Sequence, residues 1–222
     1  MSRESIVSAS KLHRQMMNLL TTPSDLDLLQ LMMAGDEDAF TMIYRRRQGG
    51  VYRFALHMSG SQTLAEDVTQ EVFIVLMREA GRFDPSRGSL AAYLYGIARN
   101  HVLRRIEQDR LFVPLVDSPE DSAGISATLI ADGDPLGDLT RNETIQELRQ
   151  SILVLPPHYR EVIVLCELQE MSYVEAASVI GCAVGTLRSR LHRARALLVE
   201  RLRAARARNS DSEEVKPARC FA

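Results

Sequence analysis

The chain has 222 residues, of which 45% are hydrophobic and 25% charged, and its formal net charge at pH 7 is −2. This is an ordinary soluble composition, and the length fits one large or two small domains. The sequence has no apolar run of roughly 18 residues and no signal-peptide core, which argues against membrane insertion and export. The cysteines form no CxxC pair and the histidines lack ligand spacing. We therefore expect a cytoplasmic protein with no metal site and no other cofactor.

The first part of the chain predicts a polar arm followed by helices. Residues 1–24 are mostly polar, which indicates a flexible N-terminal arm. Apolar residues then recur at helical spacing as far as Gly35, and Asp36 is placed to cap a long second helix. The pair Gly49-Gly50 weakens the second prediction, because a glycine inside a helix costs about 1 kcal/mol relative to alanine.

The third predicted helix carries a polar, mainly acidic strip. Thr63 is expected to cap this helix, which extends from Leu64 to about Arg82. Phe73 interrupts the strip and would give it an exposed apolar anchor, as interfaces often have. The residues alone leave two interpretations, a solvated face or a docking strip for a basic partner. The strip consists of Glu66, Asp67, Gln70 and Glu71.

The loop at residues 83–89 and the helix after it combine aromatic with basic side chains. Proline and glycine bracket the polar residues of the loop, and Ser89 is expected to open a fourth helix. Tyr93 and Tyr95 lie on that helix. Such a combination suits single-stranded DNA, whose bases stack on aromatic rings while arginines hold its phosphates. The alternative is that the tyrosines are core residues and the arginines are solvated. The polar candidates are Arg87, Arg99, Asn100, His101, Arg104 and Arg105.

Residues 110–140 separate two helical domains, 25–109 and 141–205. From Leu111 onward this segment contains six acidic residues, three prolines and three glycines, with no lysine or arginine. Such a composition does not bury enough apolar surface to offset the entropy of ordering, so we expect a flexible acidic linker. In the second domain, a helix is expected from Tyr159 to Leu168. Residues 206–222 form a polar tail.

The second domain ends in a predicted helix-turn-helix. Ser172 and Glu175 form a capping box for a short helix, and Gly181 supplies the turn. A longer helix follows from about Val184, with leucines on its inner face. A donor-rich helix after such a turn fits a DNA major groove, whereas the alternative is an amphipathic helix with solvated arginines. The outer face carries Arg188, Ser189, Arg190, His192, Arg193 and Arg195.

Taken together, the two domains resemble a bacterial RNA polymerase sigma factor of the extracytoplasmic-function (ECF) type. The resemblance extends from about Asp25 to Leu202 and rests on four segments. It implies an all-α fold with an N-terminal four-helix sigma region 2, a C-terminal helix-turn-helix sigma region 4, and the flexible acidic linker between them. The segments are GDEDAF at 35–40, AEDVTQEVF at 65–73, YLYGIARN at 93–100, and the stretch from LPPHYREV to HRAR at 155–195.

The resemblance implies three binding surfaces. The strip would dock on the β′ clamp helices of core RNA polymerase through Asp67, Gln70, Glu71 and Phe73. The β flap of the polymerase is a further implied contact of the chain. Contact with the melted −10 promoter element is implied for Phe83, Arg87, Ser89, Tyr93, Arg99, Asn100 and Arg104. Contact with the −35 element is implied for Thr186, Arg188, Ser189, Arg190, His192 and Arg193. This chain departs from the family at Tyr93, where tryptophan is frequent, and at Gly96, where a basic residue is common.

The expected function is that of a dissociable, non-catalytic initiation factor. By resemblance, its partners are core RNA polymerase, promoter DNA and an anti-sigma factor. A self-sufficient repressor or activator is the alternative, but the sequence has no heptad run for dimerisation and that role leaves the tyrosine-rich helix unexplained. An enzyme with an attached DNA-binding unit would need a catalytic constellation, and none is recognisable.

Overall fold

The computed structural model describes residues 23–112 and 135–213, and these residues form helices joined by short turns and loops, without a strand. The all-α prediction is confirmed. Expectations for residues 1–22, 113–134 and 214–222 lie outside the described residues. The main helices are α2 (Asp25–Met33), α3 (Glu37–Ser59), α4 (Gln62–Glu79), α5 (Leu90–Phe112), α6 (Pro135–Leu153), α7 (Pro157–Ile163), α8 (Tyr173–Ile180) and α9 (Val184–Glu213). Shorter turns are η1 (Ala80–Arg82), η2 (Pro85–Arg87) and η3 (Val164–Leu168).

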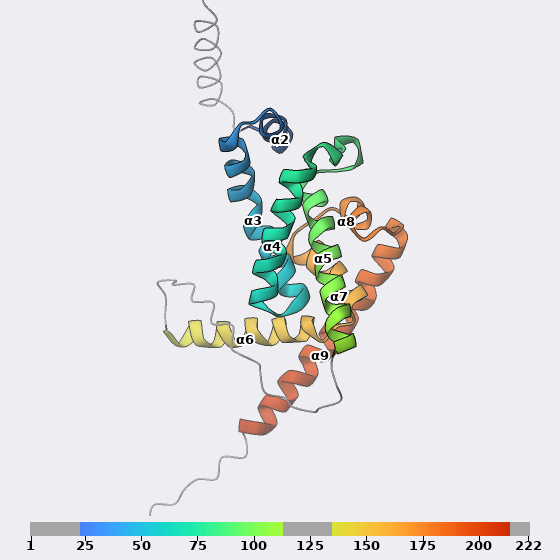
Figure 1. Cartoon of the computed structure of the whole chain (residues 1–222). Coiled ribbons are helices and arrows are strands. Elements are labelled where there is room, and N and C mark those ends of the chain that lie inside the picture. The colour runs from blue at the N-terminus through green and yellow to red at the C-terminus, as the bar shows by residue number, and fades with distance from the viewer. Residues whose placement is uncertain (1–22, 113–134, 214–222) are drawn as a thin grey trace, which may run out of the picture.

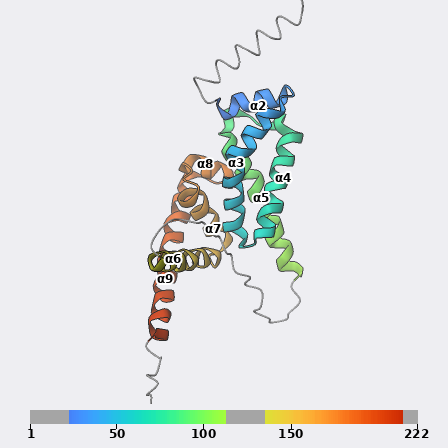
Figure 2. The same ribbon diagram turned by 90° about the vertical axis from the view of Figure 1, so that its left-hand side faces the viewer.

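In the first domain, α3, α4 and α5 lie side by side while α2 crosses one end of them (Figures 1 and 2). Their facing sides are apolar, and the largest buried side chain is Phe54 of α3. Each fully buried side chain of this size stabilises the fold by about 1.5–3 kcal/mol relative to an exposed one. The core around Phe54 includes Ile43, Met58, Val72, Leu76, Leu94 and Val102.

Of the two helix N-caps predicted in the first domain, the cap of α3 is confirmed and the cap of α4 is not. Asp36 caps α3 as expected, since its carboxylate accepts hydrogen bonds from the backbone of Asp38 and Ala39. The predicted cap of α4 was wrong. Ser61, not Thr63, is the N-cap, because its hydroxyl accepts the backbone N–H of Leu64 at 3.2 Å.

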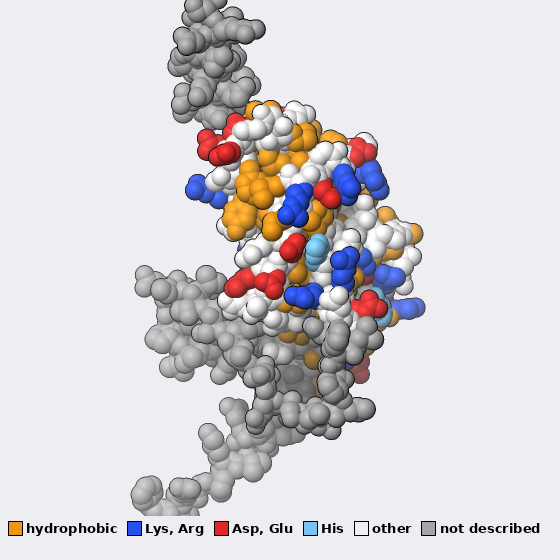
Figure 3. All heavy atoms as spheres, viewed as in Figure 1, with side chains coloured by type: hydrophobic (Ala, Val, Ile, Leu, Met, Phe, Trp, Pro, Cys, Tyr) orange, Lys and Arg blue, Asp and Glu red, His pale blue; other side chains and the backbone are white. Residues whose placement is uncertain are grey.

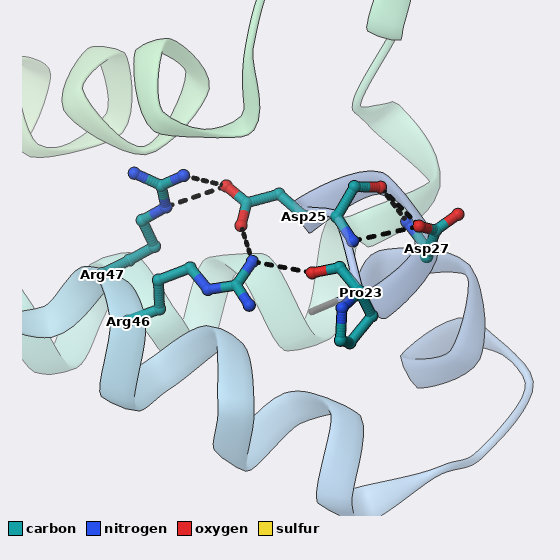
Figure 4. Close-up of polar contacts among 6 residues, drawn as sticks. Pro23, Asp25, Asp27, Arg46 and Arg47 are labelled. Carbon is teal, nitrogen blue, oxygen red and sulfur yellow. Dashed lines mark hydrogen bonds and ion pairs between the residues drawn. The ribbon is translucent and has the colours of Figure 1, made fainter. Parts of the chain in front are cut away.

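Helix α2 is tied to α3 by a branched ion pair (Figure 4). The Asp25 carboxylate accepts from Arg46 at 2.7 Å and also from Arg47. Arg46 donates a second hydrogen bond to the carbonyl of Pro23 at 3.1 Å. At the start of α2, Ser24 forms a capping box with Asp27. The chain entering the first domain is therefore fixed by both local and long-range polar contacts.

The second domain contains the expected helix-turn-helix in α8 and α9. Ser172 caps α8 by accepting the backbone N–H of Glu175, and its hydroxyl also contacts the Glu175 carboxylate at 2.8 Å. Gly181 ends α8 with φ of +77°, in the left-handed region that glycine tolerates. Leu187 and Leu191 of α9 are buried, as its predicted inner face requires.

Several predicted boundaries in this part of the chain differ from the structure. Helix α5 continues to Phe112, past the expected end of its domain, and α6 begins at Pro135, inside the expected linker. The helix predicted to end at Leu168 changes at Val164 from α to π geometry, a local widening that often occurs at functional sites. Helix α9 continues to Glu213, so part of the expected tail is helical.

The two domains contact each other directly. Helix α8 packs on α5, while α6, α7 and η3 pack on α3. Figure 2 shows α7 and α8 beside α3, with α6 crossing below. At one contact the domains approach so closely that a Cβ on Gly60 would lie 3.0 Å from a methyl group of Leu153.

Candidate nucleic-acid interface

Most of the side chains expected to meet the −10 element surround one pocket. Its volume is about 290 Å³, and it lies where the η1–η2 loop meets the first turns of α5. The rings of Phe83 and Tyr93 form part of the wall, with centroids 5.5 Å apart. Asp84 shapes the loop by accepting hydrogen bonds from the backbone and hydroxyl of Ser86, which lower the pKa of the Asp84 carboxyl. The predicted residues in the lining are Phe83, Arg87, Ser89, Tyr93 and Asn100.

The pocket's wall also includes residues from the other domain. Ser178 and Val179 of α8 line it together with the first-domain residues. Tyr93 is partly buried, which raises the pKa of its phenol above the ordinary value. An aromatic wall beside arginine and amide donors is suited to a flipped base held by stacking and hydrogen bonds.

Arg99 and Arg104 were also expected to contact the −10 element, but they lie outside this pocket. Arg99 donates from Nε to the Glu161 carboxylate at 2.7 Å. Glu161 is only 2% exposed, and its other oxygen lies 3.6 Å from Arg190 of α9. The buried Glu161 carboxylate thus joins Arg99, expected at the −10 element, to Arg190, expected at the −35 element. The spacing of these residues in the sequence did not predict this link.

The predicted polymerase-docking strip is exposed, with one exception. Asp67, Gln70 and Glu71 of α4 border a hollow with the basic end of α5, where Arg105 lies 3.8 Å from Asp67. Figure 3 shows acidic side chains over α4 beside basic side chains over α5. Arg104 lines the same hollow, so it neighbours the strip rather than the −10 pocket.

The interpretation of Phe73 as an exposed anchor of that strip was wrong. Its side chain is 3% exposed and packs edge-on against Tyr44, with ring centroids 4.8 Å apart. Phe40 is its second aromatic neighbour, at 6.4 Å. Helical spacing put Phe73 beside the acidic residues, but α3 covers this edge of α4 with rings that exclude water from it.

The side chains expected to contact the −35 element lie on the outer face of α9, and all of them except the half-buried Arg190 are exposed. Four of them line a shallow groove with His158 and Tyr159 of α7. Arg188 lies 6.0 Å from the centroid of the Tyr173 ring, a cation–π distance that orients its guanidinium. His192 borders a separate hollow further along the helix. The groove residues are Thr186, Ser189, Arg190 and Arg193.

The contacts of four residues between the domains were not predicted from the sequence. The sequence offered Tyr95 as a candidate for DNA stacking and Glu175 as part of a capping box, but gave neither a partner in the other domain. One signal was present: a glutamate within an apolar helix is rarely buried without a cation, and Glu161 precedes the run VIVL. The residues are Tyr95, Glu161, Gln169 and Glu175.

Cys166 is predicted to be poorly reactive in the folded chain. Burial, with the nearby Glu167 carboxylate, raises the pKa of its thiol to about 11. Because the thiolate is the nucleophile, iodoacetamide at pH 8 should alkylate Cys166 on the order of 100-fold more slowly than a free cysteine. Mass spectrometry of alkylated peptides measures this rate. Equal rates in native buffer and in denaturant would contradict it.

Among the residues that the structure describes, no group of His, Cys, Asp and Glu is arranged to hold a metal ion. Within the same residues, no helix is long and apolar enough to span a bilayer.

Comparison with known proteins identifies the family. Two family models match, Sigma-70 region 2 at residues 43–111 and Sigma-70 region 4 at residues 145–198. The chain is 34% identical over 175 residues to the ECF RNA polymerase sigma factor SigW of Bacillus subtilis, covering 76% of this chain and 91% of that protein. It is 31% identical over 183 residues to the RNA polymerase sigma-H factor of Pseudomonas aeruginosa, covering 80% and 93%.

Solved structures agree with this assignment. CnrH in complex with the cytosolic domain of CnrY is 26% identical, with a TM-score of 0.61 over 82% of this chain and 99% of that one. The sigma factor RpoE of Bartonella quintana, in complex with the anti-sigma factor NepR, is 25% identical, with a TM-score of 0.55 over 74% and 96%. The chain therefore belongs to the ECF RNA polymerase sigma factors.

Proposed function

We propose that this sigma factor acts as a dissociable, non-catalytic subunit that positions RNA polymerase on a specific set of promoters. Its second domain binds the −35 element through the outer face of α9, and its first domain melts the −10 element. Its docking strip, now without Phe73, binds core polymerase in the cytoplasm. The observation that carries the proposal is the pocket at the start of α5, which gathers Phe83, Arg87, Ser89, Tyr93 and Asn100 in one place.

Melting by this pocket would be driven by binding energy alone. Each base stacked on an aromatic ring contributes on the order of 1–3 kcal/mol. The DNA stacking that is lost amounts to about 1.4 kcal/mol per step. Capture of a few bases by Tyr93, Phe83 and the neighbouring polar groups therefore suffices to favour the open promoter.

We also infer control by an anti-sigma factor. The similar structure of RpoE contains the anti-sigma factor NepR, and that of CnrH contains the cytosolic domain of CnrY. Purification of this protein from its native cell should recover a small protein partner in stoichiometric amounts. Repeated recovery of only the free chain and its polymerase complex would count against such control.

Run-off transcription tests the main proposal. Purified core polymerase is combined with a library of upstream sequences, with and without this protein. New start sites that appear only with the protein would support the initiation role and reveal both promoter elements. Absence of transcripts, together with tight binding of duplex DNA by the protein alone, would instead favour an independent repressor or activator.

Arg188 and Arg193 are expected to contribute to promoter choice. Both are exposed on α9, so replacing either by alanine should leave the fold intact. If the arginine contacts a base, promoter use should fall by an amount that corresponds to about 1–3 kcal/mol of binding free energy. Sequence preference should then relax at one position of the promoter. Transcription from a set of single-base promoter variants measures this preference.

The matched control for these variants is Arg201→Ala, which removes an exposed arginine further along the same helix. It should leave sequence preference unchanged. An equal loss on all promoters for Arg188→Ala or Arg193→Ala, with a smaller dependence on salt, would show contact with phosphate only.

A further inference from the structure

The basic end of α5 lies beside the acidic strip of α4, with a hollow of about 370 Å³ between the two helices. Leu64 and Val68 form the apolar part of its lining, and they are more buried than the acidic and arginine side chains around them. The hollow therefore has an apolar floor between two polar rims. The α4 rim consists of Asp67, Gln70 and Glu71, and the α5 rim consists of His101, Arg104, Arg105 and Gln108.

The charges of the two rims are opposite, but they neutralise each other only weakly. Arg105 lies 3.8 Å from the Asp67 carboxylate, and each of these side chains is 54% exposed. Such a pair contributes little to stability, because water screens it and two long side chains must be ordered to form it. Arg104 and Glu71 are also exposed. All four charges are therefore accessible to a partner that enters the hollow.

The hollow is separate from the −10 pocket. The pocket is lined by residues of α5 from Ser89 to Asn100, whereas the hollow begins at His101, so the two share no residue. Because an α-helix rises 1.5 Å per residue, Arg104 lies about 16 Å along α5 from Tyr93. A base stacked on the Tyr93 ring would therefore not contact the hollow.

We propose that the hollow and both of its rims form one docking surface for core polymerase, and that Arg104 and Arg105 bind polymerase rather than DNA. The inference rests on the proposed function, since it takes the α4 strip as the polymerase-binding surface. It extends that surface across the hollow onto α5. Figure 3 shows the two halves, acidic over α4 and basic over α5, on one face of the molecule.

The chemistry of the surface defines its partner. The polymerase segment should present a lysine or arginine to Asp67 and Glu71, and a carboxylate to Arg104 and Arg105. The aliphatic stem of a long cationic side chain packs on apolar surface while its charge reaches an acid, which suits a hollow floored by Val68. Opposite charges on the two rims also fix the orientation of the partner, because a reversed segment would meet like charges.

DNA fits this surface poorly. A phosphate placed beside Arg105 would also lie near the Asp67 carboxylate, which is 3.8 Å from that guanidinium. Repulsion from this carboxylate would oppose the attraction of the arginine. Gln70 and Gln108, by contrast, can donate to or accept from protein side chains of either charge. The mixed polar rims thus favour a protein partner.

The test measures the affinity of core RNA polymerase for the fluorescently labelled full-length chain by anisotropy titration. In Arg104→Glu, the carboxylate expected on polymerase would be repelled instead of bound. The Kd for polymerase should rise about tenfold, which corresponds to about 1.4 kcal/mol. Because Arg104 is exposed, circular dichroism and thermal unfolding of the variant should match the wild type.

Arg45→Glu is the matched control. It makes the same change of charge at an exposed position of the same domain, on α3 and outside the hollow. Its Kd for polymerase should stay within about twofold of the wild-type value, because a distant exposed charge is largely screened.

Promoter binding distinguishes the two assignments of Arg104. Each variant is added to core polymerase at a saturating concentration, and binding of a promoter found by run-off transcription is measured at several salt concentrations. Once all polymerase is occupied, Arg104→Glu should match the wild type in promoter affinity and in salt dependence. A phosphate contact would instead lower promoter affinity and reduce the salt slope by about 1.

Three results would overturn the proposal. The first is an unchanged Kd for polymerase in Arg104→Glu. The second is an equal rise in Arg45→Glu, which would show a general effect of charge. The third is the loss of promoter affinity with a smaller salt slope, which would return Arg104 to DNA. Failure of the proposed function has a different signature, because the wild-type chain itself would then not bind core polymerase.

Discussion

Replacing Phe54 with alanine should lower the free energy of unfolding of the first domain by about 3–5 kcal/mol. The Phe54 side chain is completely buried in α3, and its ring meets that of Tyr95 in a T-shaped contact with centroids 5.6 Å apart. Truncation removes both the transferred apolar surface and the packing around it, because the surrounding helices prevent full collapse of the cavity. Denaturant titration monitored by circular dichroism measures the loss.

The effect should also reach the proposed DNA-binding face. Tyr95 rests on Phe54, and the same helix positions Ser89 and Tyr93 at the −10 pocket. Met77→Ala is the matched control, since Met77 is 54% exposed on α4. That change should alter stability by less than about 0.5 kcal/mol. Similar losses for the two variants would contradict the central place of Phe54 in the core.

Replacing Arg160 with methionine should destabilise the chain by about 3 kcal/mol, because three carbonyl groups that accept from this half-buried cation lose their donor. The Arg160 guanidinium donates to the carbonyls of Leu153 and Leu155 at the end of α6, and to that of Met58 near the end of α3. Each lies where a helix leaves carbonyls without an intrahelical partner. One cation therefore serves the negative ends of two helices, one from each domain.

Arg160→Lys distinguishes charge from geometry in the same denaturation measurement. A lysine retains the positive charge but presents a single ammonium, which lacks the planar fork that reaches three carbonyls. We expect an intermediate loss of stability. If lysine restores full stability, the contribution of Arg160 is that of its charge alone, and if methionine is tolerated, the carbonyls find other donors.

Much of this protein's architecture follows from its sequence. Helical periodicity predicted the all-α class, and Asp36, Ser172 and Gly181 correctly marked three helix ends. These signals are local: a cap or a left-handed turn depends on atoms within a few residues. The outer arginine face of α9 was readable for the same reason, since residues three and four apart share one side of a helix.

Only the tertiary structure decided which side chains from distant parts of the sequence contact one another. Periodicity placed Phe73 at the edge of the acidic strip, but the aromatic residues of α3 bury it. The hydrogen bonds of Tyr95 to Gln169 and of Arg99 to Glu161 join residues from separate domains. Gly50 belongs to the same contact, although in sequence it was only a doubtful residue within a helix. The sequence by itself determined the helices, their caps and their polar faces, because these depend on short-range geometry. Burial, and the choice of partner for each charge, depend on segments brought together only by folding.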